Sequence, residues 1–165
     1  MNFLELCKEV RRESAAASDG PSTVSGQVGI YAKMVAWTKL SYRMIVDSHR
    51  DWAFLWNRVS APIIAEKQEH TRAELGIADA KLIWMIRVIG GQPLRKITWE
   101  AYRSSREDRT DVGVPTEYAE LPNGALVFYP WPSAGTQLKF EYQRIAPDLT
   151  VDGDVPLIPA EFHDA

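Results

Sequence analysis

Apolar positions in the first third of the chain recur with the period of an α-helix. In residues 2–14 they lie three and four positions apart, which predicts a short amphipathic helix. These positions are Phe3, Leu6, Cys7 and Val10. Asn2 precedes the first of them and is the expected N-cap. Residues 15–29 are small, polar and glycine-containing, so we expect a long loop.

A second helix is predicted over residues 30–50 by the strongest periodic signal of the chain. Its main stripe consists of Tyr31, Met34, Val35, Thr38, Tyr42 and Ile45. Four further apolar residues lie off this stripe: Trp37, Leu40, Met44 and Val46. A helix that is apolar on more than one face is normally buried on more than one face. We therefore expect this helix to lie inside a larger core or between neighbouring subunits, and the shortness of the chain favours the second.

Beyond residue 50 the pattern changes to short apolar runs separated by turn residues, which is typical of antiparallel strands. Strands are expected over residues 52–60, 82–89, 117–121, 125–129 and 136–145. Pro122-Asn123-Gly124 separates the third strand from the fourth and predicts a tight hairpin. Residues 97–105 have the pattern of a helical turn capped by Thr98.

Together these elements predict an α+β fold. An N-terminal helical hairpin or bundle, residues 1–51, is expected to pack with a small antiparallel β-sheet domain, residues 52–147. Residues 148–165 are expected to form an extended C-terminal tail or the shortened start of a further helix. At 165 residues and 45% hydrophobic, the chain is long enough for one ordinary core, divided at most into two small layers.

The predicted tail is unusual because it is rich in proline and aspartate yet carries large apolar side chains. Pro156 removes a backbone donor and limits local pairing. Pro159 opens a helix-start pattern that ends after one turn, and one turn is not worth nucleating. Either a longer parent chain or a partner is therefore expected to order the tail. Its candidate partner-binding residues are Val155, Leu157, Ile158, Glu161 and Phe162, with Phe162 as the anchor and Glu161 at the rim.

The net charge of −3 conceals an uneven distribution along the chain. Residues 81–109 hold seven basic and three acidic residues, whereas residues 110–165 hold two basic and nine acidic residues. Two interpretations stay open, namely a solvated surface with local fluctuation, or complementary charge for contact between subunits. An acidic chain argues against tight nucleic-acid binding, because neutralising phosphates requires a basic face.

The single cysteine and the lengths of the apolar runs indicate where the protein is synthesised. Cys7 cannot form an intramolecular disulfide and is expected as a buried thiol on the first helix. No run approaches the roughly 18 apolar residues of a membrane-spanning helix. Glu5 interrupts the region in which a signal peptide is apolar. We therefore expect synthesis in the cytoplasm and no membrane partner.

No catalytic motif rises above chance in this sequence. Glu66, Glu69 and His70 would make a partial zinc site if Glu66 and His70 shared a helix face. Because no second histidine lies nearby, a solvated charged segment is the favoured interpretation. The aspartates in residues 148–154 match a calcium loop weakly and lack its alternating ligands and final glutamate, so a polar turn is favoured. We expect no catalytic residue, no metal and no cofactor.

Six tryptophans suggest a second function class. Aromatic platforms bind sugars and nucleic-acid bases, so a carbohydrate- or cell-surface-binding module is the alternative function. Four of the tryptophans lie in apolar runs, where packing in a core or an interface is favoured: Trp52, Trp56, Trp84 and Trp99. A small carboxylate hydrolase is the third candidate.

Short motifs in a fixed order along almost the whole chain resemble a known family. They begin with Phe3-Leu4-Glu5-Leu6-Cys7 and Gly26-Gln27, and continue with Asp51-Trp52, Leu75-Gly76-Ile77 and Ile97-Thr98-Trp99-Glu100. The most specific is Asp154-Val155-Pro156-Leu157-Ile158-Pro159-Ala160-Glu161-Phe162-His163-Asp164. In this order and spacing the motifs resemble the head-to-tail adaptor (connector) proteins of tailed bacteriophages.

The resemblance implies a structural virion protein and not an enzyme. It implies a homo-oligomeric ring, a dodecamer, in the tail and neck region of the virion, which docks on the portal protein and meets a downstream tail or nozzle protein. Genomic DNA would pass through the ring without sequence-specific binding, and synthesis would take place in the host cytoplasm. In relatives the Glu161-Phe162-His163-Asp164 motif opens a further C-terminal helix, which this sequence lacks. The family has no catalytic, metal or cofactor residues to carry over.

Overall fold

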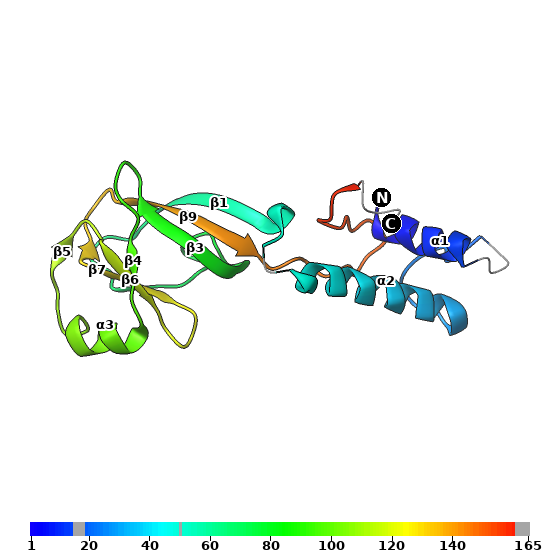
Figure 1. Ribbon diagram of the computed structural model, residues 1–165, viewed down its shortest axis with the longest axis horizontal. Coiled ribbons are helices and arrows are strands. Elements are labelled where there is room, and N and C mark those ends of the chain that lie inside the picture. The colour runs from blue at the N-terminus through cyan, green and yellow to red at the C-terminus, as the bar shows by residue number, and fades with distance from the viewer. Residues whose placement is uncertain (15–18, 50, 161–165) are drawn as a thin grey trace. The chain divides into compact units, whose positions relative to one another are not determined.

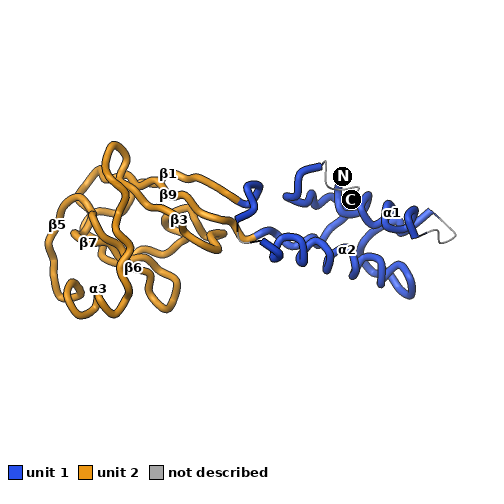
Figure 2. The backbone as a smooth tube through the Cα atoms, in the orientation of Figure 1, with its two compact units in different colours: residues 1–55, 146–165 blue, residues 56–145 orange. Residues whose placement is uncertain are grey.

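Two compact units divide the chain in the computed structural model, which describes residues 1–14, 19–49 and 51–160 (Figure 1). Unit 1 combines residues 1–55 with residues 146–165, and unit 2 consists of residues 56–145 (Figure 2). In sequence, unit 2 is therefore inserted into unit 1. Each unit has an apolar core of its own.

Unit 1 is built on two helices. Helix α1, Phe3–Glu13, begins with a capping box: the Asn2 side chain accepts a hydrogen bond from the Glu5 amide at 2.9 Å, and the Glu5 carboxylate accepts one from the Asn2 amide at 2.8 Å. This confirms Asn2 as the N-cap. Helix α2, Gly29–Ser48, has a backbone N-cap at Val28 and no side-chain cap. Cys7 on α1 is fully buried, as expected, and its thiol lies 3.7 Å from the Thr38 hydroxyl.

The core of unit 1 joins both helices to the C-terminal tail. Its buried residues are Phe3, Cys7, Val24, Val35, Tyr42, Val46, Leu55, Leu149 and Ile158. The amide of Phe3 donates to the carbonyl of Asp154 at 2.7 Å, which ties the tail to the start of α1. Residues 146–159 contain bends and turns without a helix or strand. The tail, drawn in orange and red in Figure 1, is thus an integral layer of unit 1.

The strand expected at residues 52–60 begins later than predicted. Ala53–Leu55 form a short 3-10 helix, η1, and strand β1 spans Trp56–Pro62. Leu55 is fully buried in the core of unit 1, and the indole N–H of Trp52 donates to the carbonyl of Ile45 at 2.9 Å. These contacts anchor the segment beside α2 instead of in the sheet.

Unit 2 contains three sheets. We call the three-stranded one the larger sheet, because its strands are seven to nine residues long. The larger sheet is antiparallel with the order β1-β9-β3, where β9 is Gln137–Arg144 and β3 is Ala80–Val88. The four-stranded sheet has the order β2-β7-β6-β4. Its strands are β2 Glu69–His70, β7 Leu126–Tyr129, β6 Glu117–Glu120 and β4 Arg95–Lys96. The third sheet pairs β5, Val112–Gly113, with β8, Trp131–Pro132.

Alternation along β9 explains how the larger sheet buries one face. Leu138, Phe140 and Tyr142 follow each other at every second position and are buried. They join a core that also includes Leu75, Ile77, Ile86, Leu126 and Phe128. Helix α3, Trp99–Ser105, lies in the same unit, and the Thr98 side chain accepts from the Ala101 amide at 3.2 Å, which confirms the predicted cap.

The predicted α+β class is confirmed, while the arrangement of strands differs from one small antiparallel sheet. The predicted hairpin is confirmed because β6 and β7 pair antiparallel around Pro122-Asn123-Gly124. However, β4 pairs with β6 in parallel, and so does β5 with β8. These strands have two residues each, too few to show a period in the sequence.

Two tryptophans do not lie in a core, which was one of the two kinds of packing favoured from the sequence, while their packing in an interface stays a prediction. Trp56 on β1 is 46% exposed and Trp84 on β3 is 48% exposed. Trp52 and Trp99 are partly buried and pack against the cores of their own units.

Candidate functional site

The residues considered and disfavoured as zinc ligands occupy unsuitable positions for a metal site. Glu66 has a positive φ of 56° and Glu69–His70 form strand β2, so the helix face assumed for Glu66 and His70 does not exist. Glu69 accepts a hydrogen bond from the Asn123 amide at 3.1 Å. Among the residues that the structure describes, no group of three or more histidine, cysteine, aspartate or glutamate side chains is placed to hold a metal ion.

His70 is buried, in contrast to the solvated charged segment favoured from the sequence. Its ring is fully buried against the edge of Phe128, with ring centroids 5.5 Å apart, and Nε2 lies 3.0 Å from the carbonyl of Lys67. Because a carbonyl only accepts, Nε2 carries a proton. Burial lowers the pKa of His70 below its ordinary value of 6.5. The residue therefore fixes the end of β2 within the core of unit 2.

The aspartates considered as a calcium loop are engaged by their own chain. Asp152 accepts hydrogen bonds from the Val24 amide at 2.6 Å and the Thr23 hydroxyl at 3.0 Å. Asp154 accepts from the amides of Thr150 and Val151, which lowers the pKa of its carboxyl. Asp148 pairs with Arg43 of α2 at 2.7 Å. These contacts support the polar-turn interpretation and attach the tail to unit 1.

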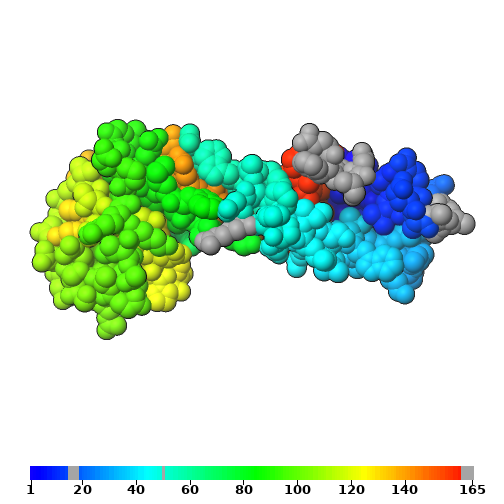
Figure 3. Space-filling view, in the orientation of Figure 1, coloured from blue at the N-terminus to red at the C-terminus, as the bar shows by residue number. Residues whose placement is uncertain are grey.

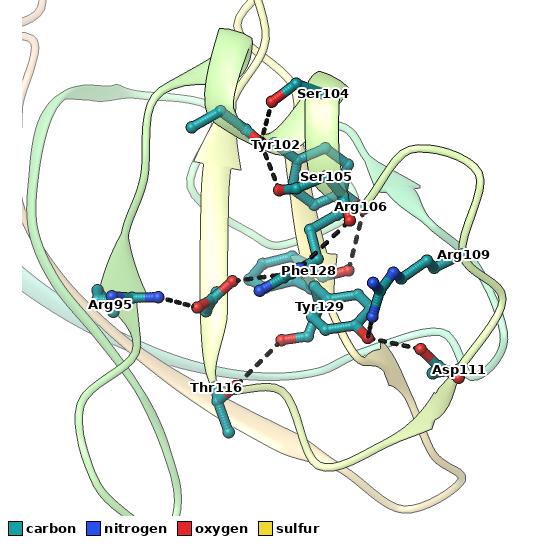
Figure 4. Close-up of polar contacts among 12 residues, drawn as sticks. Arg95, Tyr102, Ser104, Ser105, Arg106, Arg109, Asp111, Thr116, Phe128 and Tyr129 are labelled. Carbon is teal, nitrogen blue, oxygen red and sulfur yellow. Dashed lines mark hydrogen bonds and ion pairs between the residues drawn. The ribbon is translucent and has the colours of Figure 1, made fainter.

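A cluster of charges and aromatic rings lies beside α3 in unit 2 (Figure 4). Glu117 is almost fully buried and pairs with both Arg95 and Arg106. The guanidinium of Arg106 stacks over the ring of Tyr129 at 4.7 Å, and the Tyr129 hydroxyl donates to Asp111 at 2.5 Å. The hydrogen bond from Arg95 and the neighbouring guanidinium groups lower the pKa of Glu117 despite its burial.

Opposite charges from the two stretches noted in the sequence thus meet within one chain. Arg95, Lys96 and Arg106 come from residues 81–109, and their acidic partners Glu117 and Glu120 come from residues 110–165. This part of the complementary charge is used inside unit 2 and is not free for contact between subunits. The hydroxyls of Ser104 and Ser105 both donate to the carbonyl of Ala101, so these serines support α3.

A continuous row of exposed apolar side chains in unit 1 lies on α2. The buried face of α2 consists of Met34, Val35, Thr38, Tyr42 and Val46. Val46 is therefore buried although it was assigned off the stripe, and Ile45 is 42% exposed although it was assigned to it. The opposite face carries four large apolar side chains that are 50% to 64% exposed: Ile30, Trp37, Leu40 and Met44. We call these four residues the outer stripe; Figure 3 shows part of α2, in cyan and light blue, at the surface.

A groove of about 370 Å³ lies beside the outer stripe, between α2 and the tail. It is lined by Ala36, Lys39, Leu40, Tyr42, Arg43, Asp148, Leu149 and Thr150. Leu40 belongs to both the groove and the outer stripe, so the two surfaces are continuous. The Arg43–Asp148 ion pair links the helix wall of the groove to its tail wall.

The tail residues predicted to bind a partner have unequal environments. Ile158 is only 9% exposed and lies in the core of unit 1, and Leu157 packs against that core. Val155 is 62% exposed. Glu161 and Phe162 lie outside the described residues. The chain itself therefore covers two of the apolar side chains for which a partner was expected, because the tail folds back across α1.

Comparison with known proteins places the chain in a family. In the part of the chain that the structure describes, no helix has the length and apolar character needed to cross a membrane. The curated proteins contain no match. The family model described as SU10 adaptor protein matches residues 1–165, which is the whole chain. This protein therefore belongs to the SU10 adaptor protein family, a bacteriophage family of structural virion proteins, as the sequence resemblance indicated in general terms.

Proposed function

We propose that this protein is the subunit of a ring, twelve-fold by family resemblance, that connects the phage head to the tail. The ring docks on the portal protein on one side and meets a tail or nozzle protein on the other, in the neck of the virion. Genomic DNA passes through its channel without sequence-specific contacts. The observation that carries the proposal is the match to an adaptor family over residues 1–165.

The outer stripe of α2 supports assembly through apolar contact. Completely burying a large apolar side chain contributes about 1.5 to 3 kcal/mol, and these four side chains are about half exposed. Covering the outer stripe would therefore contribute about 3 to 6 kcal/mol per copy, before the entropic cost of association is subtracted. An adaptor without an enzymatic site is expected to carry its function on such surfaces.

The ion pairs inside unit 2 bear on the role of charge in the ring. Because Glu117 and Glu120 already pair with cations of the same chain, few strong ion pairs between subunits are expected from these stretches. Exposed pairs are worth only about 0 to 1 kcal/mol each in any case. We therefore expect ring assembly to depend weakly on salt.

Native mass measurement of the purified protein mixed with the portal protein of the same phage tests the proposal. We expect a complex that contains one portal and a closed ring of this chain, stable from about 0.05 to 0.5 M salt, where screening shortens the Debye length roughly threefold. A chain that stays monomeric at high concentration with portal present would refute the ring and the docking together. Loss of the complex across the salt series would instead refute the apolar character of the contact.

The alternative, a carbohydrate- or cell-surface-binding module, is supported by exposed tryptophans, namely Trp37 of the outer stripe and Trp56 and Trp84 of the larger sheet. Trp56 is an unsuitable platform because the guanidinium of Arg58 stacks on its ring at 4.9 Å while also pairing with Glu141 at 2.9 Å. Trp84 is the remaining candidate on the larger sheet. Glycan binding that disappears in Trp84→Ala would support this alternative, and an absence of glycan binding would exclude it.

A further inference from the structure

We propose that the outer stripe of α2 in one copy of this chain inserts into the groove between α2 and the tail of the next copy. This inference rests on the proposed ring function and names the surfaces that would form the ring. It also accounts for a helix that is apolar on two opposite faces, only one of which is covered within unit 1.

The spacing of the outer stripe makes it a ridge suited to another helix. Ile30, Trp37 and Met44 repeat every seven residues, with Leu40 between the last two. A seven-residue repeat drifts by only about 20° per repeat around an α-helix, so the three side chains stay on one line. Such a line packs against a neighbouring helix in the manner of a coiled-coil seam.

The positions of ridge and groove favour a head-to-tail contact. At about 100° per residue, the helix wall of the groove, formed by Ala36, Lys39 and Arg43, faces roughly 120° away from the ridge. A two-fold contact, whether ridge to ridge or ridge to groove in both directions, ends at a dimer. Two different surfaces on one subunit that point in different directions instead generate a ring when copies follow one another.

The groove has the size and composition to receive the ridge. A volume of about 370 Å³ lies within the range of roughly 300 to 1,000 Å³ found for clefts that enclose small ligands, so a large side chain fits. Tyr42 and Leu149 provide apolar wall. Lys39, Arg43 and Asp148 form a charged rim around it, which is the arrangement of an apolar centre and polar edge seen in protein interfaces.

The size of the contact explains why a ring is required. The ridge spans residues 30–44, about 21 Å at 1.5 Å per residue, and a helix about 10 Å wide then offers roughly 200 Å². A stable pair of proteins buries about 800 Å² per partner. One contact is therefore too small to hold a dimer in solution, whereas in a closed ring every copy makes two of them and docking on the portal adds further contacts.

Cysteine cross-linking distinguishes this arrangement from the alternatives. We propose the single variants Met44→Cys on the ridge and Ala36→Cys in the groove, and the variant with both changes, each mixed with the portal protein and oxidised mildly. Intrachain bonding in the double variant is excluded, because eight residues of helix separate the cysteines by about 12 Å and a disulfide needs Cα atoms within about 7 Å. The unaltered chain is the control, since Cys7 is fully buried.

We expect the double variant to give a ladder of covalent multimers on a denaturing gel, the mixture of the two single variants to give dimers, and each single variant to stay monomeric. A covalent dimer of Met44→Cys alone would show ridge-to-ridge contact and overturn the inference. Monomers throughout, although the unaltered chain assembles with portal, would show that another segment or protein covers the ridge. Failure of the unaltered chain to assemble would refute the proposed function itself.

A second pair of variants tests the same contact without oxidation. Met44→Glu places a charge on the ridge, and Val114→Glu places one on a comparably exposed apolar residue of unit 2. Assembly with portal is expected to fall at least tenfold for Met44→Glu and to remain for Val114→Glu. Equal assembly of both variants would overturn the inference, and melting curves identify any variant that fails to fold.

Discussion

Replacing Ile158 by alanine should destabilise unit 1 even in the absence of any partner. Ile158 is 9% exposed and closes a core formed with α1 and α2, so truncation removes buried apolar surface and leaves a cavity. Buried isoleucine-to-alanine changes cost about 2 to 5 kcal/mol. Because Ile158 lies near the end of the tail, where the surroundings can partly collapse, we expect about 2 to 4 kcal/mol.

Val155→Ala is the matched control. Both residues are β-branched and lie three positions apart in the same tail, but Val155 is 62% exposed, so its truncation should change the free energy of unfolding by less than about 0.5 kcal/mol. Urea unfolding followed by tryptophan fluorescence measures both, because Trp52 packs against the core of unit 1. With a slope near 2 kcal/mol/M, the midpoint for Ile158→Ala should fall by roughly 1 to 2 M.

These two variants separate a tail that belongs to the fold from a tail that serves only to bind a partner. A purely partner-binding tail would leave the urea midpoint unchanged in both variants and would weaken assembly with portal in both. That result would refute the assignment of Ile158 to the core of unit 1. Deleting residues 155–165 is expected to lower the stability of unit 1 through the loss of Ile158.

Three further predictions concern local interactions. His70→Asn should remove a pH dependence of stability. Because the folded-state pKa of His70 lies below 6.5, the unfolded chain binds more protons, and the stability of the unaltered protein should fall as the pH drops below 6.5. Urea midpoints at pH 7.5 and pH 5 measure this fall. Glu117→Gln should cost about 1 to 2 kcal/mol at pH 7, since Arg95 is exposed and its pairing is screened. Because the pKa of Glu117 is lowered in the folded protein, its carboxylate stabilises the fold fully above about pH 4.5 and loses this effect as the pH falls below that value. The difference in stability between the unaltered protein and Glu117→Gln should therefore shrink below pH 4.5. A difference that stays constant would contradict the proposed cause. Asn2→Ala should lose the capping box and cost about 1 kcal/mol by thermal melting, whereas Asn2→Ser should retain most of the stability.

Elements with many periods were predictable from the sequence, and short ones were not. α1, α2 and β9 each show several repeats of a helical or strand period, and their bounds agree with the predicted segments within a few residues. A two-residue strand such as β4 shows no period, and its parallel pairing with β6 depends on a surface that only the folded unit provides. The predicted strand at Trp52 failed because Leu55 packs on α2, a tertiary contact that overrides local preference.

The presence of a second apolar contact face could be predicted from the sequence, but not all of the residues that form it. The excess of apolar residues on α2 indicated a second contact face, which agrees with the exposure of Trp37 and Met44. Val46 follows Tyr42 by four residues, so its place on the buried face was available from the spacing. The sequence of the tail indicated that its apolar side chains must be buried against another surface. A proline-rich segment without a helical or strand period does not indicate which surface that is.

The insertion of unit 2 into unit 1 has a consequence for synthesis on the ribosome. The α1 and α2 segments leave the exit tunnel about 100 residues before Leu149, which their core requires. At about 5 to 20 residues per second, that delay lasts roughly 5 to 20 seconds. β9, Gln137–Arg144, is the central strand of the larger sheet of unit 2 and emerges only shortly before Leu149, so neither unit is complete during most of this interval. The core of unit 1 can therefore close only after all of residues 56–145 have been made, when Leu149 and Ile158 reach α1 and α2.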